Sequence, residues 1–248
     1  ARRQRHRGRN HGIDVAGHQM ADGKDDYFVT VGRIAAEKNT GLAAKLCAQL
    51  GVPFKIGGII GNISTPEQLE ARLGGAQHQD LKKDILYFRD AVVPYLQPGK
   101  IEYVGSVTGE VKDRLIGRAK AFLMPIAWDE PFGVAVIDAL VCGTPVVAMR
   151  RGSMPEIIEH GVNGFLADTP EEFAVYMQRV EEIDPAACRR SVEEKFSYQF
   201  MAQRYAATYE RIVKRHALAK GPAKFVPAWR PQPAFYEQLT KNKRKPQV

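Results

Sequence analysis

The chain has 248 residues, 44% of them hydrophobic, and a formal net charge of +8. This length allows one good hydrophobic core or slightly more. The sequence contains no apolar run of about 18 residues, so we expect no membrane-spanning helix. Its basic start, ARRQRHRGRN, has no apolar segment behind it, so we expect no secretory signal either.

The positive charge is concentrated at the two ends. Residues 1–9 contain five Arg, and residues 217–248 contain seven Lys or Arg against one Glu, which leaves the body slightly acidic. Basic tails attract nucleic acids and anionic lipids, but the sequence carries no RRM, KH or helix-turn-helix signature. We therefore expect no nucleic-acid partner, while a nucleic-acid-associated protein that works through its tails stays open as an alternative.

The cysteines are few and scattered: Cys47, Cys142 and Cys188 all fall in apolar helical patterns. This pattern is typical of reduced thiols in a cytoplasmic protein, packed as small hydrophobic side chains. The six histidines show no ligand spacing, and Asp-x-Asp does not occur. We therefore expect a cytoplasmic protein without a metal site, with peripheral attachment to a membrane left open.

The first elements in chain order form a phosphate-binding corner. Residues 1–25 have the composition of a basic linker, and Tyr27–Val31 that of a strand, which runs into a glycine turn and then an amphipathic helix. In α/β sheets, such a turn receives phosphate groups. Arg33 and Lys38 flank the turn and could neutralise a diphosphate, the first by paired hydrogen bonds and the second as a point charge. Taken singly, each would be an ordinary surface charge.

Three further strands follow, at Val52–Gly58, Ile101–Gly105 and Ala121–Met124. Between the first two, residues 62–98 form an insertion-like, mostly helical stretch to which we assign no chemistry. The segment GGIIG at 57–61 does not satisfy G-x-G-x-x-G, so it favours a strand end with flexible glycines over a dinucleotide site.

The stretch from Trp128 to Val147 organises the rest of the chain. An apolar stripe along 134–141 predicts a helix packed on a sheet. The start of that helix leaves backbone N–H groups free to receive an anion or ligand oxygens. Glu130 stands beside these amides and Asp138 follows two turns later, an arrangement suited to a polyhydroxylated ligand; on residue types alone, a helix cap and a solvated acid stay open. The amides belong to Phe132, Gly133 and Val134.

The remaining sequence continues the alternation of strands and helices. Val146–Met149 is a strand, and after it we expect a glycine-rich turn, a short helix and a final hairpin-like strand. Helical stretches at 170–183 and 185–216 follow. The alternation predicts an α/β fold with one doubly wound, mostly parallel sheet. We place this domain at 26–216, before a basic, Pro-rich and aromatic tail at 217–248.

Four segments resemble a known family. The run EPFGVAVIDALVCGTPVVA at 130–148 resembles the E-x7-E signature of retaining GT-B glycosyltransferases of family 4, with Asp138 in place of the second Glu. The segment VGRIAAEKN at 31–39 is similar to that family's VGR-x-x-x-EK motif, and GSV at 105–107 to its G-x-V turn. Asn10–Asp14 resembles the segment that joins the two halves of such enzymes.

The resemblance implies a Rossmann-like domain that forms the donor-binding half of a GT-B fold. The reaction implied is transfer of a sugar from a nucleoside-diphosphate sugar, with retention at the anomeric carbon. The implied catalytic residues are Arg33 and Lys38, which would stabilise the departing diphosphate, and Glu130, which would hold the sugar. The cations and the helix start would do the work of a metal, so no metal or other cofactor is implied.

The same resemblance assigns donor-binding roles to the remaining candidates. The backbone amides of residues 132–134 would hold the sugar together with Glu130, and Asp138 would hold the ribose. Val107 would contact the base, with Lys112 near it. The base itself, in UDP, GDP or ADP, stays undetermined. The family places Pro-Ser where this chain has Pro125-Ile126, which removes a hydrogen bond expected from that Ser.

The sequence also raises the question of the acceptor side. About 25 residues precede the first strand, whereas a domain usually needs about 100 or more. The resemblance therefore implies an N-terminal acceptor domain in a longer chain, or a partner subunit, and leaves the acceptor unknown. Trp229, Phe235 and Tyr236 would dock onto that domain. The alternative is a non-catalytic nucleotide-sugar-binding module.

Overall fold

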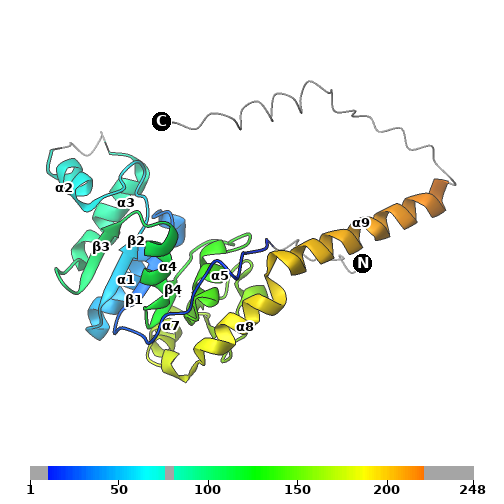
Figure 1. Cartoon of the computed structure of the whole chain (residues 1–248). Helices are drawn as coiled ribbons and strands as arrows, with labels where there is room; N and C mark the ends of the chain where they lie inside the picture. Colours follow the sequence, from blue (N-terminus) through cyan, green and yellow to red (C-terminus); the bar gives the residue numbers. More distant parts are fainter. Residues whose placement is uncertain (1–10, 76–80, 221–248) are drawn as a thin grey trace, which may run out of the picture. The chain divides into compact units, whose positions relative to one another are not determined.

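The computed structural model describes residues 11–75 and 81–220, with side chains described as far as residue 216. These residues divide into two compact units at the boundary between Arg204 and Tyr205 (Figure 1). The expected basic tail and its aromatic residues Trp229, Phe235 and Tyr236 lie outside the described residues, as do residues 1–10 of the expected linker. The boundaries at 25/26 and 216/217 stay predictions.

Within the described residues of the first unit, six parallel strands form one sheet in the order β3-β2-β1-β4-β5-β6. Phe28 lies opposite Phe54 on one side and Ala121 on the other, which sets the register at the centre. The α/β, doubly wound, parallel sheet expected from the sequence is therefore confirmed. The strands are β1 (Phe28–Val31), β2 (Phe54–Gly57), β3 (Ile101–Gly105), β4 (Ala121–Met124), β5 (Val146–Met149) and β6 (Gly164–Ala167).

Helices of the first unit cover both faces of this sheet (Figure 1). Connections between parallel strands are right-handed. Helix α1 leads from β1 to β2 in one direction along the sheet, and α5 leads from β4 to β5 in the other direction. The two helices therefore lie on opposite faces. Helix α3 packs against α1, and α4 and α8 pack against α5. The helices are α1 (Thr40–Leu50), α2 (Pro66–Gly75), α3 (Lys83–Ala91), α4 (Gly109–Gly117), α5 (Val134–Val141), α6 (Met154–Ile157), α7 (Pro170–Met177), α8 (Pro185–Lys195) and α9 (Tyr198–Lys220), with short 3-10 turns at η1 (Ala36–Lys38), η3 (Val93–Tyr95) and η4 (Val180–Glu182).

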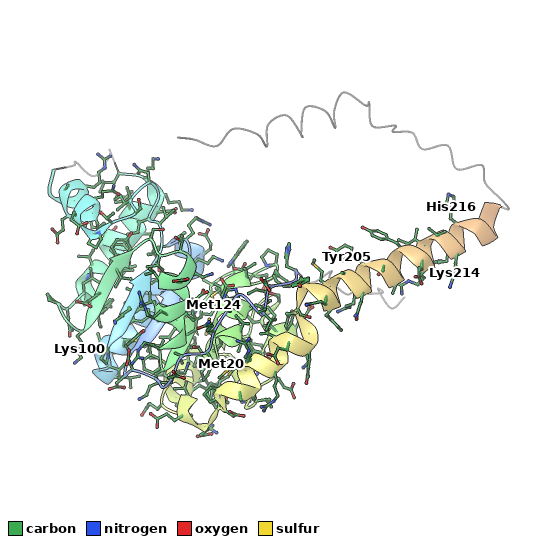
Figure 2. The ribbon with its side chains drawn as sticks, viewed as in Figure 1. Met20, Lys100, Met124, Tyr205, Lys214 and His216 are labelled. Carbon is green, nitrogen blue, oxygen red and sulfur yellow. The ribbon has the colours of Figure 1, made fainter. Side chains whose placement is uncertain are left out.

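The core follows from the apolar strand sequences. Strands β4, β5 and β6 are buried along their whole length, as parallel strands covered on both faces must be. Met124, the last residue of β4, lies among packed side chains (Figure 2). The edge strand β3 instead alternates buried and half-buried residues. Each large side chain buried here contributes about 1.5–3 kcal/mol to stability, and Phe54, Phe88 and Phe122 are completely enclosed.

One expectation about local structure is wrong. The last strand is not hairpin-like, because β6 pairs in parallel with β5; the connection at 150–163 is long enough for a crossover and contains a helix. The stretch 185–216 is helical as expected, but it consists of two helices. It breaks between α8 and α9 at Phe196 and Ser197, because the carbonyl of Phe196 accepts a hydrogen bond from the Ile13 amide at 2.9 Å.

Residues 11–25 contact the body of the first unit at several points. The Lys24 ammonium donates to the Gly117 carbonyl at 2.6 Å and to the Thr144 hydroxyl at 2.8 Å. Arg189 donates to the carbonyls of Val15 and His18 at 3.1 and 2.9 Å. The segment therefore packs along the surface formed by α4, α5 and α8.

The cysteines match their expectation: all three are free and buried. Burial raises the pKa of the Cys142 and Cys188 thiols to about 12, so both stay protonated at neutral pH. In the described part of the chain, every helix is too short or too polar to cross a bilayer.

Candidate functional site

The candidate residues gather where the sheet reverses its direction of winding. The chain runs from β1 outward to β2 and β3, and then returns to place β4 on the other side of β1. In open α/β sheets, ligands bind beyond the carboxyl ends of the strands at this point. The loop after β1 carries Arg33 and Lys38, and the loop after β4 carries Glu130. A hydrogen bond from the Ala127 amide to the Glu37 carbonyl, 3.0 Å long, joins the two loops.

Lys38 and Glu130, distant in sequence, form an ion pair at this edge. Their side chains are 23% and 12% exposed, so water screens the pair only in part. The Trp128 indole donates to the same carboxylate at 3.1 Å, and its ring centroid lies 5.4 Å from the Lys38 ammonium. Asn39 helps to place Lys38: it adopts φ 55°, alone among the non-glycine residues described, and joins η1 to α1. Asn tolerates this conformation better than most residues.

Arg33 has different partners. Its guanidinium pairs with Glu37 in the same loop, and its Nη1 lies 3.4 Å from Asp84 Oδ2 in α3. The Glu37 backbone N–H and then Arg33 hold the pKa of the Glu37 carboxyl below its usual value, against the effect of burial. Arg33 remains 55% exposed. Helix α3 belongs to the stretch 62–98, so that stretch contacts a candidate catalytic residue although the sequence indicated no chemistry for it.

The Glu130 loop is held in place by the turn that follows β5. The Ser153 amide donates to the Glu130 carbonyl at 2.8 Å, and the buried Ser153 hydroxyl donates to the Phe132 carbonyl at 2.7 Å. Gly152 packs directly on the loop: a Cβ at this position would lie 2.4 Å from the backbone nitrogen and oxygen of Glu130. Gly152 also has φ 54°, so glycine is required twice over.

The expected amide cradle lies at the start of α5. Gly133 is the N-cap residue, with φ 88° and no side chain to satisfy the first N–H groups of the helix. The Phe132 ring turns toward His11, 4.9 Å away between centroids. The Val134 side chain is 54% exposed. Together, the three residues offer backbone N–H groups at the positive end of a helix.

Asp138 lies farther along α5 and pairs with Lys112 of α4, at 2.8 Å. The Lys112 ammonium also lies 3.7 Å from Asp113. Burial by itself would lower the pKa of Lys112, but the hydrogen bond that its ammonium donates to Asp138 and the charges of both carboxylates outweigh it and raise the pKa. The two residues expected at the ribose and near the base are therefore in direct contact.

Val107 follows β3 at the same edge of the sheet. Its side chain packs over Gly57, where a Cβ would approach Val107 Cγ2 to 3.1 Å. Tyr103 fixes the neighbouring turn by donating from its hydroxyl to the Gly58 carbonyl at 2.8 Å. The position expected to contact the base is therefore an apolar surface supported by β2 and β3.

The sequence interpretation missed three contributors to this site: Trp128, Gly152 and Ser153. Trp128 opens the central stretch, and its N–H donor beside Glu130 was a usable signal. The Gly-Ser pair after β5 gave a weaker signal, because turns of this composition are common. Which loop such a turn supports depends on tertiary packing.

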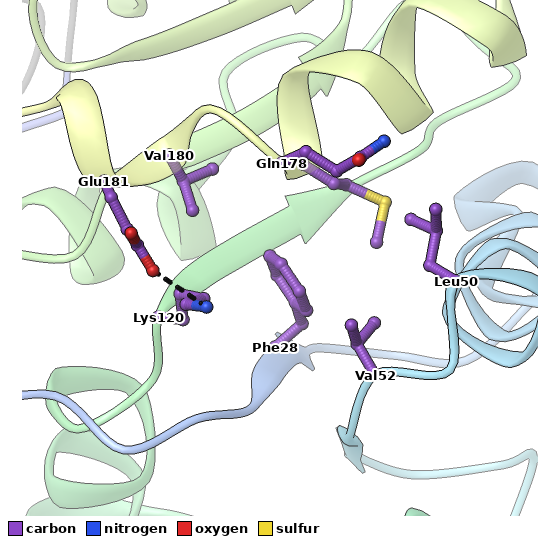
Figure 3. A pocket seen from close by; sticks show the side chains of 8 residues that line it. Phe28, Leu50, Val52, Lys120, Gln178, Val180 and Glu181 are labelled. Atoms are coloured by element: carbon purple, nitrogen blue, oxygen red, sulfur yellow. Dashed lines mark ion pairs between the residues drawn. The ribbon is translucent and has the colours of Figure 1, made fainter.

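A separate cavity of about 200 Å³ lies at the opposite edge of the sheet (Figure 3). Phe28 begins β1 and Lys120 directly precedes β4, so the cavity opens at the amino ends of the strands. Lys120 forms an ion pair with Glu181 at 2.9 Å across it. None of the expected site residues lines this cavity.

The arrangement at the carboxyl edge offers cations, two carboxylates and helix-start amides around one strand junction. Comparison with known proteins identifies the family to which this chain belongs. The family model described as "Glycosyl transferases group 1" matches residues 17–196. The chain belongs to the group 1 glycosyl transferases.

Relatives and solved structures agree with this family. The chain is 30% identical over 125 residues to the D-inositol 3-phosphate glycosyltransferase of Mycolicibacterium vanbaalenii, a region that covers 48% of this chain and 28% of the relative. Sucrose-phosphate synthase from Thermosynechococcus elongatus has a similar fold, with a TM-score of 0.63 and 20% identity over 83% of this chain and 52% of that one.

A second solved structure is Anabaena Alr3699/HepE in complex with UDP and glucose, with a TM-score of 0.61, 18% identity, and coverage of 80% of this chain and 55% of that one. These neighbours are GT-B glycosyltransferases, and at such identities the likeness concerns the fold. The chain spans a third or less of the length of the curated relatives it matches, and about half of these solved structures.

Proposed function

We propose that this chain binds a nucleoside-diphosphate sugar and forms the donor site of a retaining glycosyltransferase. The observation that carries the proposal is the Lys38–Glu130 ion pair beside the start of α5, at the point where the sheet reverses its winding. A diphosphate needs positive charge and hydrogen-bond donors, and a sugar needs acceptors for its hydroxyl groups. This junction offers both within two adjoining loops.

Each candidate residue takes one part of the donor. Lys38 carries three N–H donors, so it can hold Glu130 and a phosphate oxygen together. Glu130, oriented by Lys38 and Trp128, accepts hydrogen bonds from the sugar, and the amides at 132–134 approach the same group. Arg33 reaches the diphosphate by exchanging its exposed ion pairs for phosphate, which stabilises the charge that develops on the leaving group.

The nucleoside part of the donor binds at Asp138 and Val107. Asp138 receives the ribose hydroxyls while its ion pair with Lys112 orients the carboxylate. Val107 offers an apolar surface to the base. UDP is the first nucleotide to test, because a structural neighbour of this chain holds UDP and glucose; GDP and ADP complete the set. The diphosphate is neutralised by Arg33, Lys38 and the helix start, so we propose that binding requires no divalent cation.

The acceptor side is proposed to lie on another domain or subunit. The chain matches about half the length of the solved glycosyltransferases it resembles. Alignment of two substrates in a closed cleft accounts for about 7–11 kcal/mol of a barrier, which an open donor site forfeits. The second candidate function is therefore a donor-binding module without activity of its own. Turnover near 1 per second with donor sugars and a broad acceptor panel would contradict that candidate.

Isothermal titration calorimetry with UDP, GDP and ADP, without added divalent cation, tests the proposal. We expect one diphosphate to bind, and Arg33→Ala to weaken it by about 1.5–3 kcal/mol, the usual loss for a hydrogen bond to a charged group. Lys195→Met is a matched control, because Lys195 also pairs with a carboxylate, Glu159 at 3.2 Å, but on α8. Absence of binding by all three diphosphates at millimolar concentration would contradict the proposal.

A further inference from the structure

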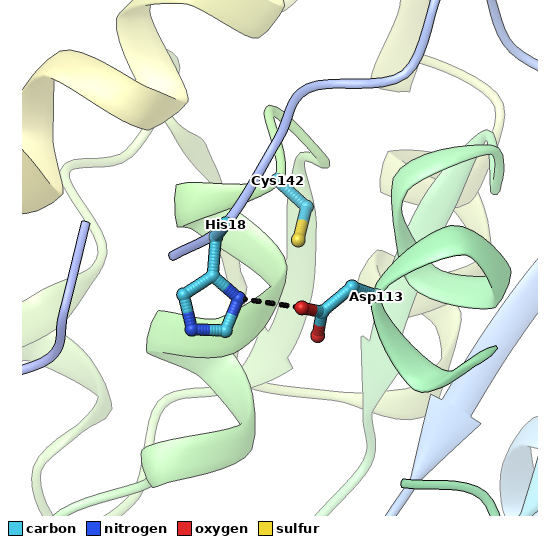
Figure 4. A group of neighbouring side chains, drawn as sticks. All are labelled: His18, Asp113 and Cys142. Carbon is cyan, nitrogen blue, oxygen red and sulfur yellow. Dashed lines mark ion pairs between the residues drawn. The ribbon is translucent and has the colours of Figure 1, made fainter. Parts of the chain in front are cut away.

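Three side chains of metal-ligating type meet beside the Lys112–Asp138 pair of the candidate donor site. His18 comes from the segment 11–25, Asp113 from α4, and Cys142 directly follows α5 (Figure 4). Their nitrogen, oxygen and sulfur atoms all lie within 4.8 Å of one another. Among the described residues, these three form the group of His, Cys, Asp or Glu side chains that could hold a metal ion. Three separate parts of the chain therefore bring three different ligand atoms to one place.

Two of these side chains have unsatisfied polar atoms. His18 Nδ1 and Asp113 Oδ1 are enclosed and, in the described structure, have no hydrogen bond of acceptable geometry, although Nδ1 lies 2.9 Å from Asp113 Oδ2. Enclosed polar atoms without a partner destabilise the folded chain. A group that bonds to both would remove this destabilisation.

We propose that His18, Asp113 and Cys142 bind a zinc ion, with water as the fourth ligand. Zinc accepts nitrogen, oxygen and sulfur ligands in a tetrahedron with bonds of about 2.0–2.3 Å, which separates the ligand atoms by about 3.3–3.8 Å. His18 Nδ1 and Asp113 Oδ2 are 2.9 Å apart, slightly closer than two zinc ligands. All separations between the three ligand atoms are at most 4.8 Å. The ion therefore fits after small rotations of the side chains. Cys142 is protonated in the metal-free chain, so binding of the ion releases the thiol proton. The resulting thiolate and the carboxylate together balance the charge of the ion.

Two lysine side chains lie near the cluster and affect the binding of a metal ion. Lys112 lies 3.7 Å from Asp113 Oδ1, although its main partner is Asp138. The Lys24 ammonium reaches the hydroxyl of Thr144, two residues after Cys142. Both ammonium groups repel a metal ion, so binding requires the carboxylate and the thiolate at once. Loss of either anion should therefore remove high-affinity binding rather than weaken it slightly.

The site would fasten the segment 11–25 to the helical face of the sheet. Cys142 lies eight residues along α5 from Val134, which corresponds to about 12 Å at 1.5 Å per residue. The zinc site is therefore separate from the amides at the start of α5. Its existence does not depend on the donor-binding proposal, and either can fail without the other.

The test is zinc titration of the full chain, free of any affinity tag, in competition with a chromophoric chelator. We expect one zinc ion with a dissociation constant of about 1 µM or tighter. His18→Gln should weaken binding by about tenfold or more. Asp113→Asn and Cys142→Ala should each remove high-affinity binding. Cys188→Ala is the matched control, because that thiol is also buried but lies outside the cluster, and it should bind zinc as the parent does.

Cobalt provides a second readout, because its spectrum reports a thiolate ligand directly in the parent chain. Co²⁺ added to the parent chain should give a thiolate-to-cobalt charge-transfer band, which Cys142→Ala removes and Cys188→Ala keeps. Zinc should also raise the thermal unfolding midpoint of the parent, and His18→Gln, in which the substitution falls outside any helix or strand, should lose that shift. Absence of zinc binding, or equal binding in the parent and all three ligand variants, would overturn the proposal.

Discussion

The two lysine–carboxylate pairs of the candidate donor site look alike in composition but are held in different ways. The Lys38–Glu130 side chains are 23% and 12% exposed, and those of Lys112–Asp138 are 22% and 15% exposed. Asp138 sits inside α5, so its position follows from the helix. Glu130 sits in an irregular loop whose backbone is fixed by Ser153 and Gly152. In one motif of constant spacing, the position of Asp138 is therefore determined by its own helix. The position of Glu130 is determined by tertiary contacts.

The largest effect should come from the turn that supports Glu130. A Cβ in Gly152→Ala would lie 2.4 Å from two backbone atoms of Glu130, at a φ of 54°. We expect a loss of about 2–4 kcal/mol of unfolding free energy, from backbone strain and overpacking, measured by urea unfolding. Nucleotide-sugar binding should also weaken, because the Glu130 loop must move.

Gly109→Ala is the matched control for this variant. Gly109 has φ 55°, but a Cβ there would meet nothing within 4 Å. It should therefore lose only about 1 kcal/mol, from strain alone. If the two variants lost equal stability, the close packing of Gly152 on the Glu130 loop would not matter, and the contrast between the two carboxylates would be wrong.

The sequence predicted those parts of the fold that depend on local patterns. Continuous apolar runs such as Ala121–Met124 indicated buried parallel strands, and the run at 130–148 indicated the family. The break at Phe196 could not be seen, because it depends on a hydrogen bond to Ile13, far away in the chain. Periodicity of a helical stretch carries no information about such a partner.

The same limit applies to the candidate site. The sequence placed Arg33, Lys38 and Glu130 in separate segments, and the doubly wound topology brings those segments to one edge. It did not indicate that Asp84 would contact Arg33, since charge pairs across a fold leave no spacing pattern. The roles of the individual residues in donor binding stay predictions.

A smaller effect concerns the strength of the two ion pairs. In double-mutant cycles of urea unfolding, Lys38→Met with Glu130→Gln, and Lys112→Met with Asp138→Asn, should each give a coupling energy of about 1–2 kcal/mol, because the pairs are largely shielded from water. The exposed pair Lys195–Glu159 should give about 0–0.5 kcal/mol. A coupling at Lys38–Glu130 no larger than in this control would contradict the proposed orientation of Glu130.

The smallest effect is a pH dependence at Lys24. The stem of this residue is exposed while its ammonium contacts Gly117 and Thr144, and burial lowers its pKa from 10.5 to about 8. Between pH 8 and 10.5 the unfolded chain then binds more protons than the folded chain, so stability rises with pH in this window. Solvent around the stem screens the effect.

Chemical unfolding at pH 8 and pH 10.5 measures this dependence. Relative to Lys24→Met, the parent chain should gain about 0.5–1 kcal/mol across the window. Burial raises the pKa of Tyr27 and Tyr103 to about 12 in both chains. The comparison with the variant therefore removes the contribution of tyrosine ionisation to the pH dependence. A constant or shrinking difference would show that the Lys24 ammonium is not held in a low-polarity contact.

The central claim is that the two carboxylates serve different parts of one donor. Calorimetry of the nucleoside, the nucleoside diphosphate and the nucleotide sugar with Glu130→Gln and Asp138→Asn tests it most directly. Asp138→Asn should weaken all three ligands, because each contains the ribose. Glu130→Gln should leave the nucleoside and diphosphate unchanged and weaken only the nucleotide sugar. Equal losses from both variants with every ligand would contradict the claim.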